Sequence, residues 1–214
     1  MAMTNDPSDT GHLLERLRGG DRQALTDLFQ RHRARLRRMV ELRLDARLQG
    51  RIDASDVLQD AFLDAASHLD AYLRGTDLPP FLWLRCVVSQ RLAICHRRHR
   101  GTKMRDVSQE ISLHRDATPQ ASSAALASML LGRLTSPSNA AIRAEQVLRV
   151  QEALNALDPI DREAIALRQF EELSRAEMAQ VLGITEEAGA KRYIRALRRL
   201  KAVLESRPGG AEGH

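Results

Sequence analysis

Basic side chains recur along residues 186–204 at positions that could bind an anionic polymer. They are Lys191, Arg192, Arg195, Arg198, Arg199 and Lys201. Such groups neutralise backbone phosphates and donate hydrogen bonds to base edges in the major groove of DNA. Apolar residues recur between them at helical spacing, so the pattern predicts an amphipathic helix with a DNA-binding polar face. The structural alternative is a terminal helical hairpin whose basic face is only solvated.

The residues before this helix predict a helix-turn-helix. Ser174 and Glu177 have the spacing of a capping box, which starts a helix. Gly183 can adopt the left-handed conformation that ends it, and Thr185 can cap the next helix. In this arrangement the second helix enters the major groove.

An acidic segment covers residues 53–72 and needs a cationic partner. Asp56, Asp60 and Asp64 follow at intervals of four, so they share one helix face with Gln59. No Lys or Arg lies between Asp53 and Asp70, so we expect the partner to be another protein. Capping of the helix N-terminus is the alternative for the first carboxylates, but it leaves Asp60 and Asp64 unexplained.

A basic segment follows at residues 85–105, which contain no acid. Its arginines could follow a phosphate backbone. Tyr72, Phe81 and Trp83 lie close by, and aromatic rings beside a basic track suit unstacked bases, although such rings are more often part of a core. His96 and His99 lack a third ligand nearby, so we expect no metal site.

Composition excludes several other classes of protein. The chain has 214 residues, 43% of them hydrophobic, and a net charge of +5. No apolar run is long enough to span a bilayer and the first residues are polar, so we expect a cytoplasmic protein that does not enter the membrane. Cys86 and Cys95 form no disulfide framework. We find no catalytic constellation, phosphate-binding loop or cofactor motif and expect a protein that is not an enzyme.

Helical periodicity predicts an all-α fold of two domains. Residues 10–105 contain four amphipathic segments and form the first domain, and residues 141–207 form the second, helix-turn-helix domain. Residues 106–140 are rich in Ser, Ala and Thr and are predicted to be mainly a flexible linker, with a short helix possible around 126–134. Within the second domain, Asp158 and Pro159 can start a new helix.

These segments together resemble a sigma-70-family RNA polymerase sigma factor of the extracytoplasmic-function type. Residues 53–72 are similar to the family's polymerase-binding region 2.2, residues 80–100 to regions 2.3 and 2.4, and residues 154–200 to region 4. The phrases SPSNAAIRAE, RQFEELSRAEMA and KRYIRAL resemble variants that are abundant in planctomycetes.

The resemblance implies two sets of contacts for the first domain. The acidic helix would bind the clamp helices of the largest polymerase subunit through Asp56, Gln59, Asp60 and Asp64. The melted minus-ten element would be held by Arg74, Trp83, Gln90, Arg91, Arg97, Arg98 and Arg100. Gln90 falls where many relatives carry an Asn that contacts a flipped base.

For the second domain the resemblance implies contacts with the polymerase flap region and with the minus-thirty-five element. Base contacts fall to Glu187, Lys191, Ile194 and Arg195, and phosphate contacts to Arg168, Ser174, Arg175 and Arg192. Many relatives have Gly-Thr-Val-Lys-Ser where this chain has residues 187–191, EAGAK. Gly189 lacks a side chain for packing there, and the upstream sequence should differ from the commonest one.

Two classes of function remain open on the sequence alone. The first is a promoter-specificity subunit that binds core polymerase and promoter DNA, with an anti-sigma factor, a kinase or control of synthesis as its regulator. The second is a free-standing dimeric helix-turn-helix regulator that binds duplex DNA through residues 141–207. A dimeric regulator has no need of the acidic face around Asp60, so this face separates the two.

Overall fold

The computed structural model describes residues 7–45, 47–48, 50–75, 78–99, 118–132 and 140–206. All regular secondary structure within these ranges is helical, which confirms the predicted all-α fold. No helix in this part of the chain is both long and apolar enough to cross a bilayer. The chain divides into two compact units, one of residues 1–40 and 46–113 and the other of residues 41–45 and 114–214.

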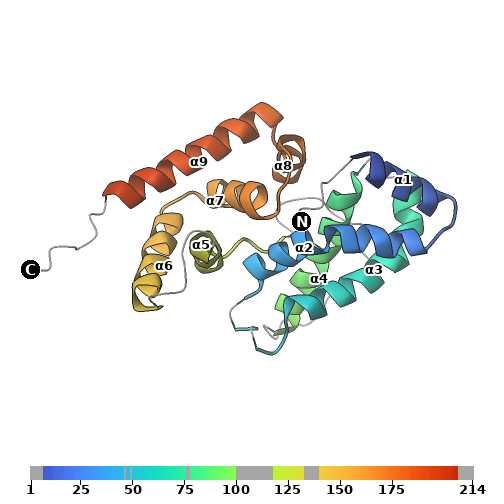
Figure 1. The fold of residues 1–214 in the computed structure, drawn as a ribbon, viewed down its shortest axis with the longest axis horizontal. Helices are drawn as coiled ribbons and strands as arrows, with labels where there is room; N and C mark the ends of the chain where they lie inside the picture. Colours follow the sequence, from blue (N-terminus) through green and yellow to red (C-terminus); the bar gives the residue numbers. More distant parts are fainter. Residues whose placement is uncertain are drawn as a thin grey trace, which may run out of the picture. The chain divides into compact units, whose positions relative to one another are not determined.

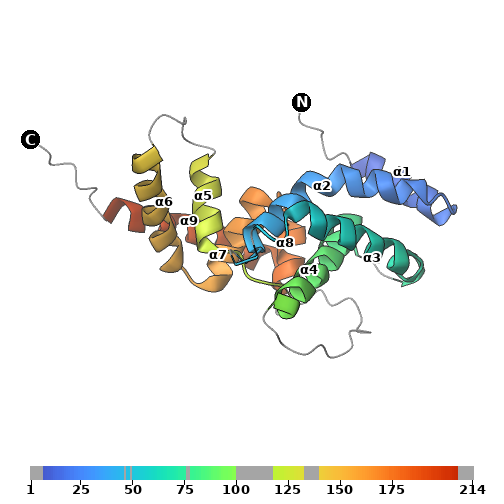
Figure 2. The same ribbon diagram turned by 90° about the horizontal axis from the view of Figure 1, so that it is seen from below.

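Within the described residues, the first unit contains four helices. They are α1 (Pro7–Arg18), α2 (Gln23–Arg43, whose last residues are counted with the second unit), α3 (Ala54–Gly75) and α4 (Pro80–His99). The turn before α2 contains Gly20 at a φ of 89°, and the Asp21 carboxylate accepts a hydrogen bond from the backbone N–H of Gln23. Helices α3 and α4 pack on one another, as Figure 2 shows, and bury the predicted apolar stripes. This packing fixes which polar side chains of α3 and α4 can meet.

The second unit contains the remaining helices of the described chain (Figure 1). They are α5 (Ser123–Gly132), α6 (Ala140–Asn155), α7 (Pro159–Ile165), η2 (Ala166–Phe170), α8 (Arg175–Leu182) and α9 (Glu186–Ser206). Leu126 and Ala127 of α5 are fully buried, in one core cluster with Leu154 of α6 and Phe170.

Helix α5 corrects the predicted extent of the linker. Residues 123–132 form a helix beside α6, because Leu126 and Leu131 supply an apolar side that packs on its neighbour. Composition rich in Ala and Ser conceals this, since Ala is also the best helix former. The part of the predicted linker at residues 101–117 and 133–139 lies outside the described residues.

Helix α7 begins as predicted, with Asp158 at the N-cap and Pro159 in the first turn. The cap works differently from the expectation, however. The Asp158 carboxylate makes no capping hydrogen bond, whereas its backbone carbonyl accepts hydrogen bonds from the N–H groups of Asp161 and Arg162. The Asp158 carboxylate pairs instead with Arg199 of α9, whose guanidinium nitrogen lies 3.1 Å from Oδ2.

The predicted helix-turn-helix is confirmed in its local details. Ser174 Oγ accepts a hydrogen bond from the N–H of Glu177, and the Glu177 carboxylate accepts one from the N–H of Ser174. Gly183 ends α8 in the left-handed conformation at a φ of 65°. Thr185 Oγ1 then accepts a hydrogen bond from the N–H of Ala188 in the first turn of α9. These contacts set where α8 ends and α9 begins (Figure 1).

Candidate protein and nucleic-acid interfaces

The start of α3 uses its first two carboxylates locally. Oδ1 of Asp53 accepts hydrogen bonds from the N–H groups of Ser55 and Asp56, at 2.6 and 3.0 Å. Oδ2 of Asp56 accepts one in return from the N–H of Asp53 at 3.0 Å. The alternative that these two residues serve the helix N-terminus is therefore supported, although Asp56 remains exposed.

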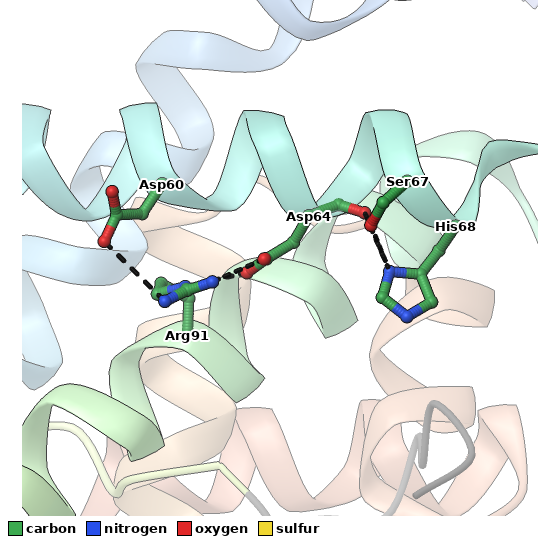
Figure 3. Close-up of polar contacts among 5 residues, drawn as sticks. All are labelled: Asp60, Asp64, Ser67, His68 and Arg91. Atoms are coloured by element: carbon green, nitrogen blue, oxygen red, sulfur yellow. Dashed lines mark hydrogen bonds and ion pairs between the residues drawn. The ribbon is translucent and has the colours of Figure 1, made fainter. Parts of the chain in front are cut away.

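Arg91 of α4 pairs with the acidic face of α3, as Figure 3 shows. Its Nε donates to Oδ2 of Asp64 at 2.7 Å, and its terminal nitrogens lie against Asp64 Oδ1 and, at 3.7 Å, Asp60 Oδ2. The expectation that no internal cation relieves this face is wrong, because it considered only neighbours along the chain. The hydrogen bond to Asp64 raises the pKa of Arg91, whose side chain is only 18% exposed. Arg91 is thus committed to the fold rather than available to DNA.

The exposed part of this face is smaller than predicted and includes an apolar residue. Gln59 is exposed, and the Asp60 side chain is 53% exposed against 28% for Asp64. Leu63 is 62% exposed and lies one turn after Gln59 and Asp60, beside the row of carboxylates. Sequence reasoning missed Leu63, although its spacing of five residues from Leu58 already places it off the buried stripe. An exposed leucine flanked by carboxylates and an amide suits a protein partner.

A cavity of about 410 Å³ opens beside this face in the first unit. Its lining combines buried apolar side chains with exposed charged ones: Leu48, Ile52, Asp56, Val57, Asp60, Cys95 and Arg98. Burial raises the pKa of the Cys95 thiol, which therefore stays protonated in neutral solution. The cavity extends the partner-binding candidate from α3 towards the end of α4.

The three aromatic residues predicted to lie beside the basic track are core residues. Trp83 is 1% exposed, and its ring stacks on Tyr72 with centroids 4.2 Å apart and an interplanar angle of 9°. The Tyr72 hydroxyl donates to the carbonyl of Leu78 at 2.9 Å, and burial raises the pKa of this tyrosine to about 12. Phe81 is equally buried. The prediction that Trp83 is available to an unstacked base is wrong, because α4 buries the side of the helix that carries Trp83.

The remaining minus-ten candidates divide by accessibility. Arg74, Arg97 and Arg98 are exposed, and Gln90 is half-buried. Arg100 lies outside the described residues. An accessible amide and three exposed guanidinium groups can contact bases and phosphates. Among the predicted minus-ten residues that the structure describes, Arg74, Gln90, Arg97 and Arg98 are thus at least partly accessible to solvent.

Helix α9 presents an exposed row that matches most of the predicted base contacts. The row consists of Glu187, Lys191, Ile194 and Arg198, at intervals of four, three and four. Ile194 is 47% exposed, and Lys191 pairs with Glu187 through an exposed ion pair. Such a surface pair contributes little to stability and exchanges readily for DNA. Arg198, which was not among the predicted contacts, joins them through its register.

Two predicted phosphate contacts of the second unit are instead engaged within the fold. Arg168 donates to the backbone carbonyl of Leu173, and its guanidinium lies 5.8 Å from the centre of the Tyr193 ring. Arg192 binds Asp161 at 2.7 Å and is 26% exposed. Both sequence assignments are corrected, because nearby partners occupy these guanidinium groups. Ser174 and Arg175 are exposed as expected.

Gly189 is buried where α9 crosses α8, so its missing side chain leaves no gap. A Cβ at this position would lie 3.1 Å from Cε of Met178, which fills the space. The expectation of lost packing is therefore wrong. Glycine allows the Met178 side chain to approach the backbone of α9 closely.

The sequence of this chain is similar to those of known proteins. The family model described as Sigma-70, region 4, matches residues 148–200, from α6 to α9. RNA polymerase sigma factor CarQ of Myxococcus xanthus is 29% identical over 195 residues, covering 89% of this chain and 95% of CarQ. RNA polymerase sigma factor NccH of Alcaligenes xylosoxydans xylosoxydans is 28% identical over 205 residues, covering 94% and 97%.

The chain thus functions as an RNA polymerase sigma factor. This sigma factor directs transcription initiation by binding core polymerase and promoter DNA. It is also similar to the solved structure of CnrH in complex with the cytosolic domain of CnrY. That match has a TM-score of 0.51 at 25% identity and covers 91% of this sigma factor and 96% of the CnrH chain.

Proposed function

We propose that the two units divide promoter recognition between them. Residues 10–105 bind core polymerase through Asp56, Gln59, Asp60 and Leu63 and hold the melted minus-ten element through Arg74, Gln90, Arg97 and Arg98. Arg100 belongs to the same basic track. Residues 141–207 read the upstream duplex through Glu187, Lys191, Ile194 and Arg195, with Ser174 and Arg175 at phosphates.

The exposed row of α9 carries this proposal. It follows a complete helix-turn-helix, begins in the first turns of the second helix, and combines an acceptor, a cation and an apolar side chain. Recognition helices contact base edges with their N-terminal turns. Lys191 can donate to guanine and Glu187 can accept from cytosine N4. Arg198 lies farther along and suits a phosphate.

The same proposal covers regulation and setting. CnrH was solved with the cytosolic domain of CnrY, so a protein that covers the polymerase-binding face is a candidate regulator of this sigma factor. It would act in the cytoplasm, where polymerase and chromosome meet, without catalysis, metal or cofactor of its own. The sequence segments that resemble planctomycete variants favour a planctomycete as the organism of origin.

A promoter library randomised separately at the two elements tests the division. With reconstituted holoenzyme, Lys191→Ala should lose about 1 to 3 kcal/mol of discrimination at upstream base pairs and leave the downstream preference intact. Gln90→Ala should alter preference only within the melted element. Lys201→Ala, which removes the same charge later in α9, is the matched control. An unchanged downstream preference in Gln90→Ala would contradict its assignment, and tight polymerase-independent binding of the same duplex would favour the dimeric regulator.

A further inference from the structure

A buried carboxylate of α7 anchors one flank of α9. Asp161 is 0% exposed, and its Oδ1 lies 2.7 Å from Arg192 and 3.6 Å from Arg195. Its Oδ2 lies 3.3 Å from Arg199. One carboxylate thus meets three guanidinium groups from a single helix.

The spacing of these arginines separates them from the exposed row of α9. Arg192, Arg195 and Arg199 follow at intervals of three and four, so they line one flank of the helix, which we call the inner row. Lys191 and Ile194 belong to the exposed row beside it. The ion pairs with Asp161 act together with buried Ala196 and Leu200 to hold α9 in one rotation about its axis, and with it the direction of Lys191 and Ile194.

The buried Asp161 carboxylate needs the guanidinium groups of the inner row. A carboxylate without solvent exposure is stable only when cations or hydrogen-bond donors surround it. The inner row provides them, while the Arg195 and Arg199 side chains remain 51% and 50% exposed and can also reach an anion outside. Asp161 therefore competes with DNA phosphates for these two guanidinium groups.

We propose that Asp161 is a positioning residue for upstream promoter recognition. It sets the orientation of the exposed row and of Arg195 in the groove, and it restrains the inner row from phosphate contacts that would be made at any sequence. This inference rests on the proposed role of α9 in reading the upstream duplex. Asp161 itself does not touch DNA, so its effect is on discrimination rather than on contact.

Asp161→Asn in the full chain with core polymerase tests the proposal. Without the charge, the inner row is released, so discrimination among upstream base pairs should fall about fivefold or more. The released guanidinium groups should gain a phosphate contact, so the salt dependence of holoenzyme binding to duplex should steepen by about one counterion. A domain that is merely destabilised would lose affinity without that steeper slope.

Asp158→Asn is the matched control, since it removes an exposed carboxylate that also pairs with Arg199. It should retain both the upstream preference and the salt slope. Wild-type preference in Asp161→Asn would overturn the proposal. If circular dichroism shows that Asp161→Asn does not fold, Arg199→Gln decides: it should shift the same upstream positions less strongly, and no shift would overturn the proposal.

Lys191→Ala in the same library separates this inference from the function on which it rests. If Lys191→Ala changes upstream preference and Asp161→Asn does not, only the positioning role fails. If neither variant changes it, α9 does not read the upstream duplex, and both proposals fall.

Discussion

Arg91 on α4 holds Asp64 on α3 through two hydrogen bonds, of which the Nε to Oδ2 bond measures 2.7 Å. The two residues lie 27 positions apart in the sequence. Their pairing turns the Asp64 carboxylate toward α4 (Figure 3). Asp60, 3.7 Å from Arg91, remains 53% exposed, and Leu63 is 62% exposed. Neighbouring residues of one helix thus differ in whether the fold engages or exposes them.

A double-mutant cycle should measure this pairing. We expect a coupling of about 1 to 2 kcal/mol between Arg91→Ala and Asp64→Ala in the free energy of unfolding, because a charge-assisted, two-bond contact is largely shielded from solvent. The cycle with Asp60→Ala should give below about 0.5 kcal/mol, since that carboxylate is more exposed and 3.7 Å away. Equal coupling energies in the two cycles would show that Arg91 does not pair preferentially with Asp64 over Asp60.

Asp60 and Leu63 should carry affinity for core polymerase. We expect Asp60→Lys to weaken binding by several kcal/mol, because it reverses a charge opposite a basic partner, and Leu63→Ala to weaken it by about 1 to 2 kcal/mol. Both side chains are mostly exposed, so unfolding free energies should change by less than about 0.5 kcal/mol. Titration against core polymerase gives the affinities, with Glu15→Lys on α1 as the control. Wild-type affinity in Asp60→Lys would remove the docking assignment.

His32 should make the stability of the first unit depend on pH. Burial, with smaller contributions from the charges of Arg35 and Arg31, lowers the pKa of His32 from 6.5 to about 4. The unfolded chain therefore binds the proton more readily between these values, so stability is full above pH 6.5 and falls as pH approaches 4. We expect a loss of roughly 3 kcal/mol across this range.

Denaturant unfolding at a series of pH values measures this loss. His32→Leu should flatten the profile, and it removes two ring nitrogens that have no hydrogen-bond partner among the described residues. If wild type and variant lose stability in parallel as the pH falls, another group is responsible.

Helix α5 should resist proteolysis together with α6. We expect no early cleavage within residues 123–132 of the wild type, because Leu126 and Ala127 are fully buried. Leu126→Asp should expose this segment to cleavage by placing a charge in the core, whereas Ala124→Asp, at an exposed position of α5, should not. Mass spectrometry of the first fragments locates the cuts. Early wild-type cuts inside 123–132 would restore the longer linker predicted from composition.

Local signals in the sequence determined the helices and their ends. The Ser174 and Glu177 capping box, Gly183 and Thr185 each act within a few residues, so their spacing alone predicts the contacts that the structure contains. Periodicity likewise predicted amphipathic helices in residues 10–105, because one helix face repeats every three or four residues, and α3 buries one such face, which includes Leu58.

Only the tertiary structure decided which polar side chains are free. The charge pattern of α3 does not reveal that Arg91 pairs with Asp64. The charge pattern of α9 likewise does not reveal that Asp161 holds Arg192. Helical periodicity separates the inside of a helix from its outside, whereas an ion pair between helices depends on how they are packed. Packing also placed Trp83 on Tyr72 and left Leu63 exposed, because each helix meets its neighbours on only part of its surface.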